Sequence, residues 1–248
     1  MYFTYDGTLF GFLTVVFTAY EQHITPYAIT KEGDAQPALF ADARYIPGDS
    51  PKAERVAVGI GRISETALDS VVLAFYSGQS GRELIIYRFL QKLFEHKSGA
   101  LTMHADADCS DLLKLAGKVM HEAHMYKGYV RFRETASGVF YAPIEPDNDL
   151  LMLEDFRSHF CERYNNQPFI IHDIRHKRML VYDGAPYVIA APDKTEITYS
   201  DDELLIRRLW RVYHSSISIA SRASSKRQTG FLPKKHRRLM PEFFDDSE

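Results

Sequence analysis

Apolar residues recur every three or four positions through most of the first half of the chain. This period places them on one face of a helix. It predicts amphipathic helices over four stretches, 9–20, 65–75, 84–94 and 106–127. Thr8 is a suitable cap for the first of these helices, and Gly128 is a suitable stop for the last. The pattern therefore predicts a mainly helical N-terminal half.

Extended structure is predicted in only two places in this half. Tyr2–Tyr5 has the pattern of a short strand, and a second extended piece falls within 38–46. The rest of 32–51 is rich in glycine, proline, aspartate and alanine, so it is predicted to be loop. The apolar run 56–63 contains two glycines and is predicted to be a bulge or a tight helix entry.

Halfway along the chain the apolar period changes from 3.6 to 2. Two extended runs, Val130–Arg133 and Phe140–Ile144, flank a short turn and predict a hairpin. With a four-residue turn, Arg133 would pair with Phe140, and Arg131 would share the face of Arg133. A slip of one residue would reverse these partners, so the register stays open.

The remaining pattern predicts two helices and three more strands, at 150–164, 168–174, 179–183, 187–191 and 200–213. The chain is therefore predicted to have an α+β fold. A mainly helical N-terminal region, 1–105, precedes a second region, 106–248. In the second region about five antiparallel strands pack with helices, and a basic segment ends the chain.

Charge is distributed unevenly along the sequence. The net charge is −3, yet the stretch 204–241 holds ten basic residues and no acidic one, which leaves −13 for the rest by subtraction. Such a stretch predicts a face that meets a polyanion, and a solvated helix face followed by a surface tail is the alternative. The predicted nucleic-acid contacts are Arg131, Arg133, Arg222, Lys226, Arg227, Lys234, Lys235, Arg237 and Arg238.

Candidate catalytic groups lie on either side of the predicted hairpin. His121 and His124 are three apart on a helix and can share a face, and Glu145 and Asp147 share a face if the strand continues. These four side chains are the candidates for acid–base or metal chemistry. Capping, core hydrogen bonding or a nucleic-acid surface is the alternative role for the histidines, and helix capping for Asp147. Neither a metal nor a cofactor is predicted.

Spacing argues against several other kinds of chemistry. The sequence has no CxxxCxxC, GxxxxGK[ST] or GxSxG motif, which disfavours a radical-SAM enzyme, a P-loop ATPase and a typical serine hydrolase. His172 and Asp173 are neighbours on a strand, so they point to opposite faces and cannot form a dyad with each other. Cys109 and Cys161 lack metal-ligand spacing and indicate a reducing compartment. The run 9–20 is too short and too polar to span a membrane, so a cytoplasmic protein with no membrane partner is predicted.

Several segments of the chain resemble a family of bacterial DNA-metabolism and DNA-repair proteins that contain a domain of unknown function. The segments that carry the resemblance are YDGTLFGFLTVVFTAYE, HEAHMYKGYVRFRE, FYAPIEPDNDLL, QPFIIHD and FLPKKHRRLMPE. The resemblance covers nearly the whole chain. Members are typically encoded beside a radical-SAM protein with a DNA-repair role, and related domains occur fused to a uracil-DNA-glycosylase-like domain. The resemblance therefore implies a pathway and a radical-SAM partner, and it does not imply a mechanism.

Three functions follow from these observations. The first is a DNA-repair or DNA-modification accessory protein that binds DNA and works with the radical-SAM partner. The second is an enzyme acting on a damaged or modified base through His121, His124 and Glu145. The third is a scaffold whose basic tail docks on an acidic protein. Because the sequence has none of these three enzyme motifs, an accessory or binding protein is favoured over an autonomous enzyme.

Overall fold

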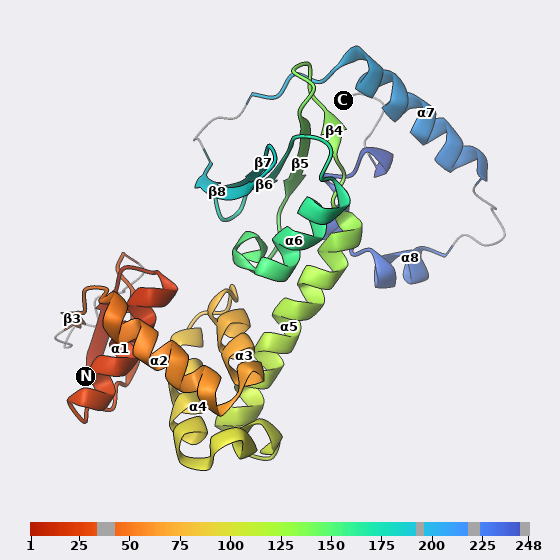
Figure 1. Ribbon diagram of the computed structural model, residues 1–248. Coiled ribbons are helices and arrows are strands. Elements are labelled where there is room, and N and C mark those ends of the chain that lie inside the picture. The colour runs from red at the N-terminus through yellow and green to blue at the C-terminus, as the bar shows by residue number, and fades with distance from the viewer. Residues whose placement is uncertain (34–42, 192–195, 218–223, 244–248) are drawn as a thin grey trace. The chain divides into compact units, whose positions relative to one another are not determined.

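The computed structural model describes residues 1–33, 43–191, 196–217 and 224–243. The chain divides into two compact units, Met1–His121 and Glu122–Glu248. The division falls inside the long helix α5, Ala107–Tyr129, so this helix ends the first unit and begins the second (Figure 1). Among the described residues, no helix has both the length and the apolar composition needed to cross a membrane.

The first unit combines a parallel sheet with α-helices. Its elements before α5 are β1 Tyr2–Tyr5, α1 Leu9–Glu21, β2 Ala28–Lys31, β3 Ala43–Tyr45, α2 Ser50–Ile63, α3 Glu65–Phe75, α4 Arg82–His96 and the 3-10 helix Lys97–Thr102. Strand β1 lies between β2 and β3 and pairs in parallel with both. The predicted strand at Tyr2–Tyr5 is confirmed, and β3 falls within the piece predicted at 38–46, of which 38–42 lie outside the described residues.

Helix α2 shows that the prediction for the stretch around it was wrong. Residues 50 and 51, predicted as loop, and residues 56–63, predicted as a bulge or a tight helix entry, belong to one continuous helix. Asp49 caps this helix, because its carboxylate accepts a hydrogen bond from the N–H of Lys52 at 3.1 Å. Ala53, Val56 and Ile60 fall on one face and are buried in the core of the unit. The glycines that suggested a bulge are tolerated inside a helix whose apolar face is packed.

The second unit is built around a five-stranded sheet in the order β4-β5-β6-β7-β8. Its elements after α5 are β4 Arg133–Glu134, β5 Phe140–Ile144, the 3-10 helix Leu150–Met152, α6 Glu154–Arg163, β6 Phe169–Asp173, β7 Arg178–Tyr182, β8 Pro186–Ala190, α7 Asp201–Ile217, α8 Ser225–Phe231, α9 Lys234–Arg237 and the 3-10 helix Pro241–Phe243. The α+β class, the helical N-terminal half and the five-stranded count are confirmed. The prediction of a wholly antiparallel sheet was wrong, because β5 and β6 run parallel and the sheet is mixed. Helix α6 lies in the connection between these two strands and allows the second to run in the same direction as the first.

The hairpin that begins this sheet has the slipped register, one residue away from the pairing expected for a four-residue turn. Arg133 pairs with Tyr141 and Glu134 with Phe140, and β4 begins only at Arg133. Arg131 precedes the strand, so the two arginines do not share an exposed strand face. The slip turns Arg133 inward, where its guanidinium donates to Tyr199 Oη at 3.2 Å and to the carbonyl oxygen of Leu239.

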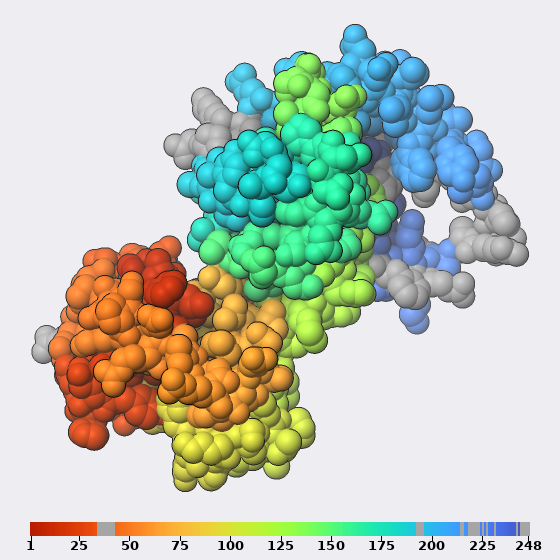
Figure 2. Space-filling model, viewed as in Figure 1, coloured from red at the N-terminus to blue at the C-terminus, as the bar shows by residue number. Residues whose placement is uncertain are grey.

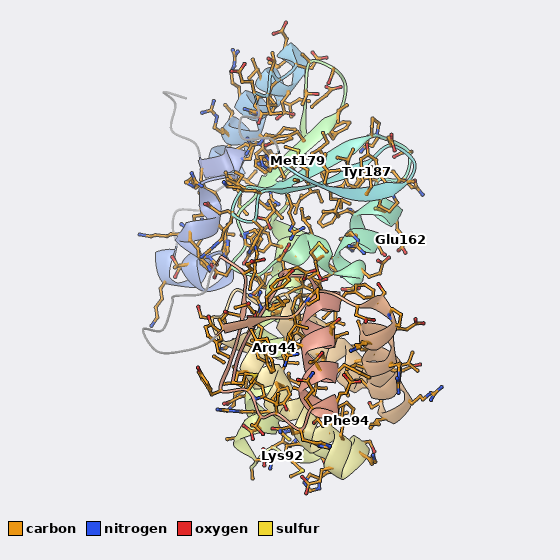
Figure 3. The ribbon with its side chains drawn as sticks, turned by 90° about the vertical axis from the view of Figure 1, so that its left-hand side faces the viewer. Arg44, Lys92, Phe94, Glu162, Met179 and Tyr187 are labelled. Atoms are coloured by element: carbon orange, nitrogen blue, oxygen red, sulfur yellow. The ribbon has the colours of Figure 1, made fainter. Side chains whose placement is uncertain are left out.

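Aromatic rings fill the core of the second unit beside β6. Phe169 is 1% exposed and stacks on Tyr182 of β7, with ring centroids 5.0 Å apart. Phe132 packs edge-on against Tyr164 at 4.7 Å and against Phe169 at 5.3 Å. Tyr187, on the edge strand β8, is by contrast an exposed side chain (Figure 3). These rings thus form a core cluster between β6 and α6, whose Phe160 also packs against Phe132.

This packing predicts a large loss of stability for Phe169→Ala. Removing a fully buried ring costs about 3–5 kcal/mol of unfolding free energy, because it leaves a cavity among the neighbouring rings. Urea unfolding followed by circular dichroism measures this loss. The control is Tyr187→Ala on the exposed edge strand, for which a change of about 0.5 kcal/mol or less is expected. Equal losses in the two variants would contradict the location of the core.

Candidate functional site

The parallel pairing of β5 and β6 brings two chain segments to one edge of the sheet. Ile144 and Asp173, the last residues of the two strands, pair with each other. The segment after β5 carries Glu145, Asp147 and Asp149. In open α/β sheets, ligands bind outside the carboxyl ends of the parallel strands, so the corresponding edge of this parallel pair is the candidate site. The acidic and imidazole side chains gathered there are called the carboxyl edge below, and they are Glu145, Asp147, Asp149, Asp173 and His176.

Helix α5 fixes the segment that follows β5. The carboxylate of Glu122 accepts hydrogen bonds from the backbone N–H groups of Asp147 and Asn148, both at 2.9 Å. It also accepts one from the side-chain amide of Asn148 at 2.5 Å. His121 and His124, the predicted catalytic histidines on either side of Glu122, are exposed on the helix. Glu122, and not either histidine, is therefore the residue of this helix that holds the segment after β5.

Asp173 and His176 form a buried pair at the end of β6. Asp173 is 0% exposed, and its carboxylate accepts from the backbone N–H of His176 at 3.0 Å and lies 2.7 Å from Nδ1 of that ring. Burial acts to lower the pKa of His176, but the hydrogen bond and charge of Asp173 outweigh it, so this pKa is raised. His172 points to the other face, as alternation predicted, and its Nδ1 lies 2.6 Å from Tyr141 Oη.

Three residues of the carboxyl edge have the chemistry of a metal site. One ligand atom from each of Asp149, Asp173 and His176 lies within 4.8 Å of the others, and no other such group occurs in the described part of the chain. Two carboxylates and an imidazole suit a transition metal better than magnesium or calcium. Arg178 Nε already lies 3.0 Å from Asp149 Oδ2, and His176 already binds Asp173. The same contacts therefore also serve as a structural network that needs no ion.

Helix α9 and Arg238, the residue that follows it, contact acidic residues that were predicted as catalytic. Lys235 pairs with Asp147, and Arg238 pairs with Glu145 at 2.5 Å. Arg175 adds a second cation to Asp147 at 2.6 Å. The hydrogen bond from Lys235 lowers the pKa of the Asp147 carboxyl, against an opposing effect of burial. The structure thus places two predicted DNA-binding cations on two predicted catalytic carboxylates.

His236 holds the same segment against the C-terminal end of α5. Its Nδ1 lies 2.9 Å from Tyr126 Oη, and its ring packs 5.1 Å from that of Tyr126 and 5.2 Å from that of Tyr129. Burial, reinforced by the neighbouring charge of Lys235, lowers the pKa of His236. Burial also raises the pKa of Tyr126. Neutral rings therefore form the centre of a contact whose rim is ionic.

The other predicted nucleic-acid contacts have different surroundings. Arg237 donates twice to the carbonyl oxygen of Leu232, at 3.0 and 3.1 Å, and lies over the ring of Phe243. Lys226 and Lys234 are exposed, and Arg131 is half-buried. Arg222 lies outside the described residues, and the side chain of Arg227, on α8, is outside them too.

Sequence reasoning missed the residues that hold the carboxyl edge together. Neither Glu122 nor His176 is among the candidate residues that spacing and motifs predict. A signal was present, because Asp173 and His176 are three apart across the turn after β6, a spacing at which a carboxylate can cap the turn. Asp149 becomes part of the site only through the parallel pairing, which the pattern of apolar residues did not predict.

The contacts of Glu122 predict that Glu122→Ala destabilises the second unit. Hydrogen bonds to a charged group contribute about 1.5–3 kcal/mol, and this variant leaves three donors of the loop without their acceptor. Chemical denaturation measures the loss. Exposed His121→Ala and His124→Ala are matched controls on the same helix, with changes of about 0.5 kcal/mol or less expected. A Glu122→Ala protein as stable as these controls would mean that the loop does not depend on this residue.

The raised pKa of His176 predicts the pH dependence of stability. The Asp173–His176 interaction contributes fully below the unfolded-state pKa of 6.5 and is lost as pH rises through the folded-state pKa. His176→Gln should therefore destabilise the protein more at about pH 5.5 than at about pH 8.5. Urea midpoints at the two pH values measure this, with exposed His124→Gln as the control. A larger loss at the higher pH would reverse the sign and contradict the pairing.

Comparison with known proteins places this architecture in a family. A family model described as a domain of unknown function, DUF4130, matches residues 80–242. This match covers well over half of the chain and includes α5, the mixed sheet, and α7 to α9. No curated protein and no solved structure matches the chain. The chain therefore belongs to the DUF4130 family.

Proposed function

We propose that this protein binds nucleic acid and acts as an accessory protein in DNA repair or DNA modification. The supporting observation is that part of its basic segment is a helix packed against the rest of the second unit. The stretch 204–241 has ten basic residues and no acidic one, and α9 within it is a docked helix. A docked helix presents its cations in a fixed arrangement, which lowers the entropy lost when phosphates bind. Lys226 and Lys234 of the same stretch are also exposed.

The rest of the proposal depends on the family resemblance. We infer from it that the protein works in the cytoplasm of a bacterium beside a radical-SAM partner with a DNA-repair role. The chain has no CxxxCxxC motif, so in this arrangement any cluster chemistry belongs to the partner. The present chain would supply nucleic-acid binding.

A second candidate function is an enzyme acting on a damaged or modified base. The observation that favours it is the group of Asp149, Asp173 and His176 at the carboxyl edge. These residues replace His121 and His124 as the acid–base or metal candidates, because the latter two are exposed on α5. Turnover of a damaged oligonucleotide that disappears in His176→Gln would favour the enzyme. DNA binding without turnover would favour the accessory protein.

The proposal predicts a binding reaction that depends on salt and on α9. If about four to six cations contact phosphates, log K should fall with log salt at a slope of roughly −4 to −5. Lys234→Gln, Lys235→Gln and Arg238→Gln combined should weaken binding and make the slope shallower by about 2 to 3, because each lost contact removes one released counterion. Fluorescence anisotropy with a labelled oligonucleotide measures both. An unchanged slope in this variant would exclude α9 as the site.

Matched variants distinguish two effects on DNA affinity: the loss of carboxylates that compete with phosphates, and a change in net charge. Glu145→Gln with Asp147→Asn removes the carboxylates that pair with Arg238 and Lys235, so binding should tighten. The control pair, Glu154→Gln with Asp155→Asn on α6, changes the charge equally. Its carboxylates pair with Arg157 and Lys127 instead. Equal tightening in both double variants would mean that only net charge matters.

A further inference from the structure

Helix α7 is oriented with its charged side toward the rest of the second unit. Glu203 is buried, and its carboxylate accepts from the backbone N–H of Glu134 at 3.1 Å and pairs with Arg207 at 2.8 Å. The guanidinium of Arg207 lies 4.0 Å from the ring centroid of Tyr199. Glu203 and Arg207 are four apart, so they lie on one stripe of the helix. The charged stripe of α7 is therefore the one that packs inward.

The opposite side of α7 is apolar and exposed. The large side chains Leu205, Ile206, Leu209, Trp210, Val212 and Tyr213 are between 46% and 63% exposed. Figure 2 shows α7 in blue at the surface of the molecule. A helix in a globular protein normally turns its apolar stripe toward the core. An outward apolar stripe of this size marks an interaction surface.

The area of this surface is close to what a specific interface requires. A half-exposed large side chain leaves about 100 Å² in solvent, so six of them offer about 600 Å². Two such faces in contact would bury about 1,200 Å², the lower bound for stable protein–protein interfaces. One helix of a second copy is therefore sufficient to cover the face. Phosphate is a poor match, because most of the exposed side chains are aliphatic.

Five of the six residues of the face are arranged symmetrically about Leu209, and the sixth, Trp210, has Arg208 at its symmetry-related position. Leu205 and Tyr213 lie four positions on either side of Leu209, and Ile206 and Val212 lie three positions on either side. A two-fold axis through Leu209 would place Leu205 opposite Tyr213 of a second copy, and Ile206 opposite Val212 of that copy. A two-fold interface needs such self-complementarity, because the same patch serves on both sides. A different partner protein would not require it.

We propose that α7 binds a second copy of this chain, antiparallel, with Leu209 at the two-fold axis. Three arginines lie between Leu205 and Tyr213, and Arg208 is the exposed one. It projects about 100° from Leu209 around the helix and stays at the rim in water. Asp202 and Ser216, both exposed, frame the two ends of the contact. The dimer thus covers the apolar face and leaves the charged rim solvated.

Light scattering of the full chain after size exclusion, at about 1 to 100 μM, tests the proposal. A dimer is expected for the wild type, and Leu209→Glu should weaken it at least about 30-fold, because two carboxylates would meet at the centre of the interface. Ile189→Glu is the matched control, since Ile189 is an exposed apolar residue on the edge strand β8. It should stay dimeric. Circular dichroism checks that both variants are folded.

Cross-linking reports the register of the two helices. In a Cys161→Ser background, Leu209→Cys should be cross-linked to the same residue of the second copy by a short thiol-specific reagent, because the two copies of residue 209 lie at the axis. Asp183→Cys, on the turn after β7, should not join in the same background. A monomeric wild type would overturn the proposal. So would a dimer that survives Leu209→Glu, or one that Ile189→Glu disrupts, since that result would assign the interface to the β8 edge.

Discussion

The parallel pairing of β5 and β6 is the constraint on which the second unit depends. It places the segments after both strands at one edge, so that carboxylates separated by a whole helix in the sequence become neighbours. Glu122 of α5 then holds the first of these segments through the N–H groups of Asp147 and Asn148. Asp173 holds the second through His176. The site is thus built from backbone hydrogen bonds to two fixed carboxylates.

Concentrating negative charge at one edge has a consequence for the basic end of the chain. Glu145 and Asp147 attract Arg238 and Lys235, while the rings of Tyr126 and His236 give the contact an uncharged centre. In the proposed function, the acidic segment occupies the position that nucleic-acid phosphates would take, and the protein exchanges its own carboxylates for those phosphates. The cost of that exchange moderates the affinity, which the surrounding cations alone would make higher.

Periodicity in the sequence was sufficient to predict the fold class and most of the elements. The helices that include Leu9 to Tyr20 and Leu84 to Phe94, and the five strands of the mixed sheet, follow from apolar spacing and turn residues. Helix α2 was missed because two glycines in an apolar run fit a bulge as well as a helix. In that case tertiary burial of Ile60 overrides local propensity.

The site was less predictable than the fold, because it depends on pairing between distant segments. Spacing cannot distinguish a parallel from an antiparallel partner for β5, and a one-residue slip decided whether Arg133 is buried or exposed. The basic segment was evident from charge alone. The contact of this segment with Glu145 and Asp147 could not be predicted from charge, since 88 residues separate Lys235 from Asp147 in the sequence.

Hydrogen–deuterium exchange with and without an oligonucleotide tests the central claim most directly. The account predicts that saturating DNA changes amide protection in α9 and in the segment after β5, because binding replaces the contacts of Lys235 and Arg238. It predicts little change in the helices of the first unit. Protection changes confined to the first unit, or saturating binding with α9 unchanged, would contradict the account.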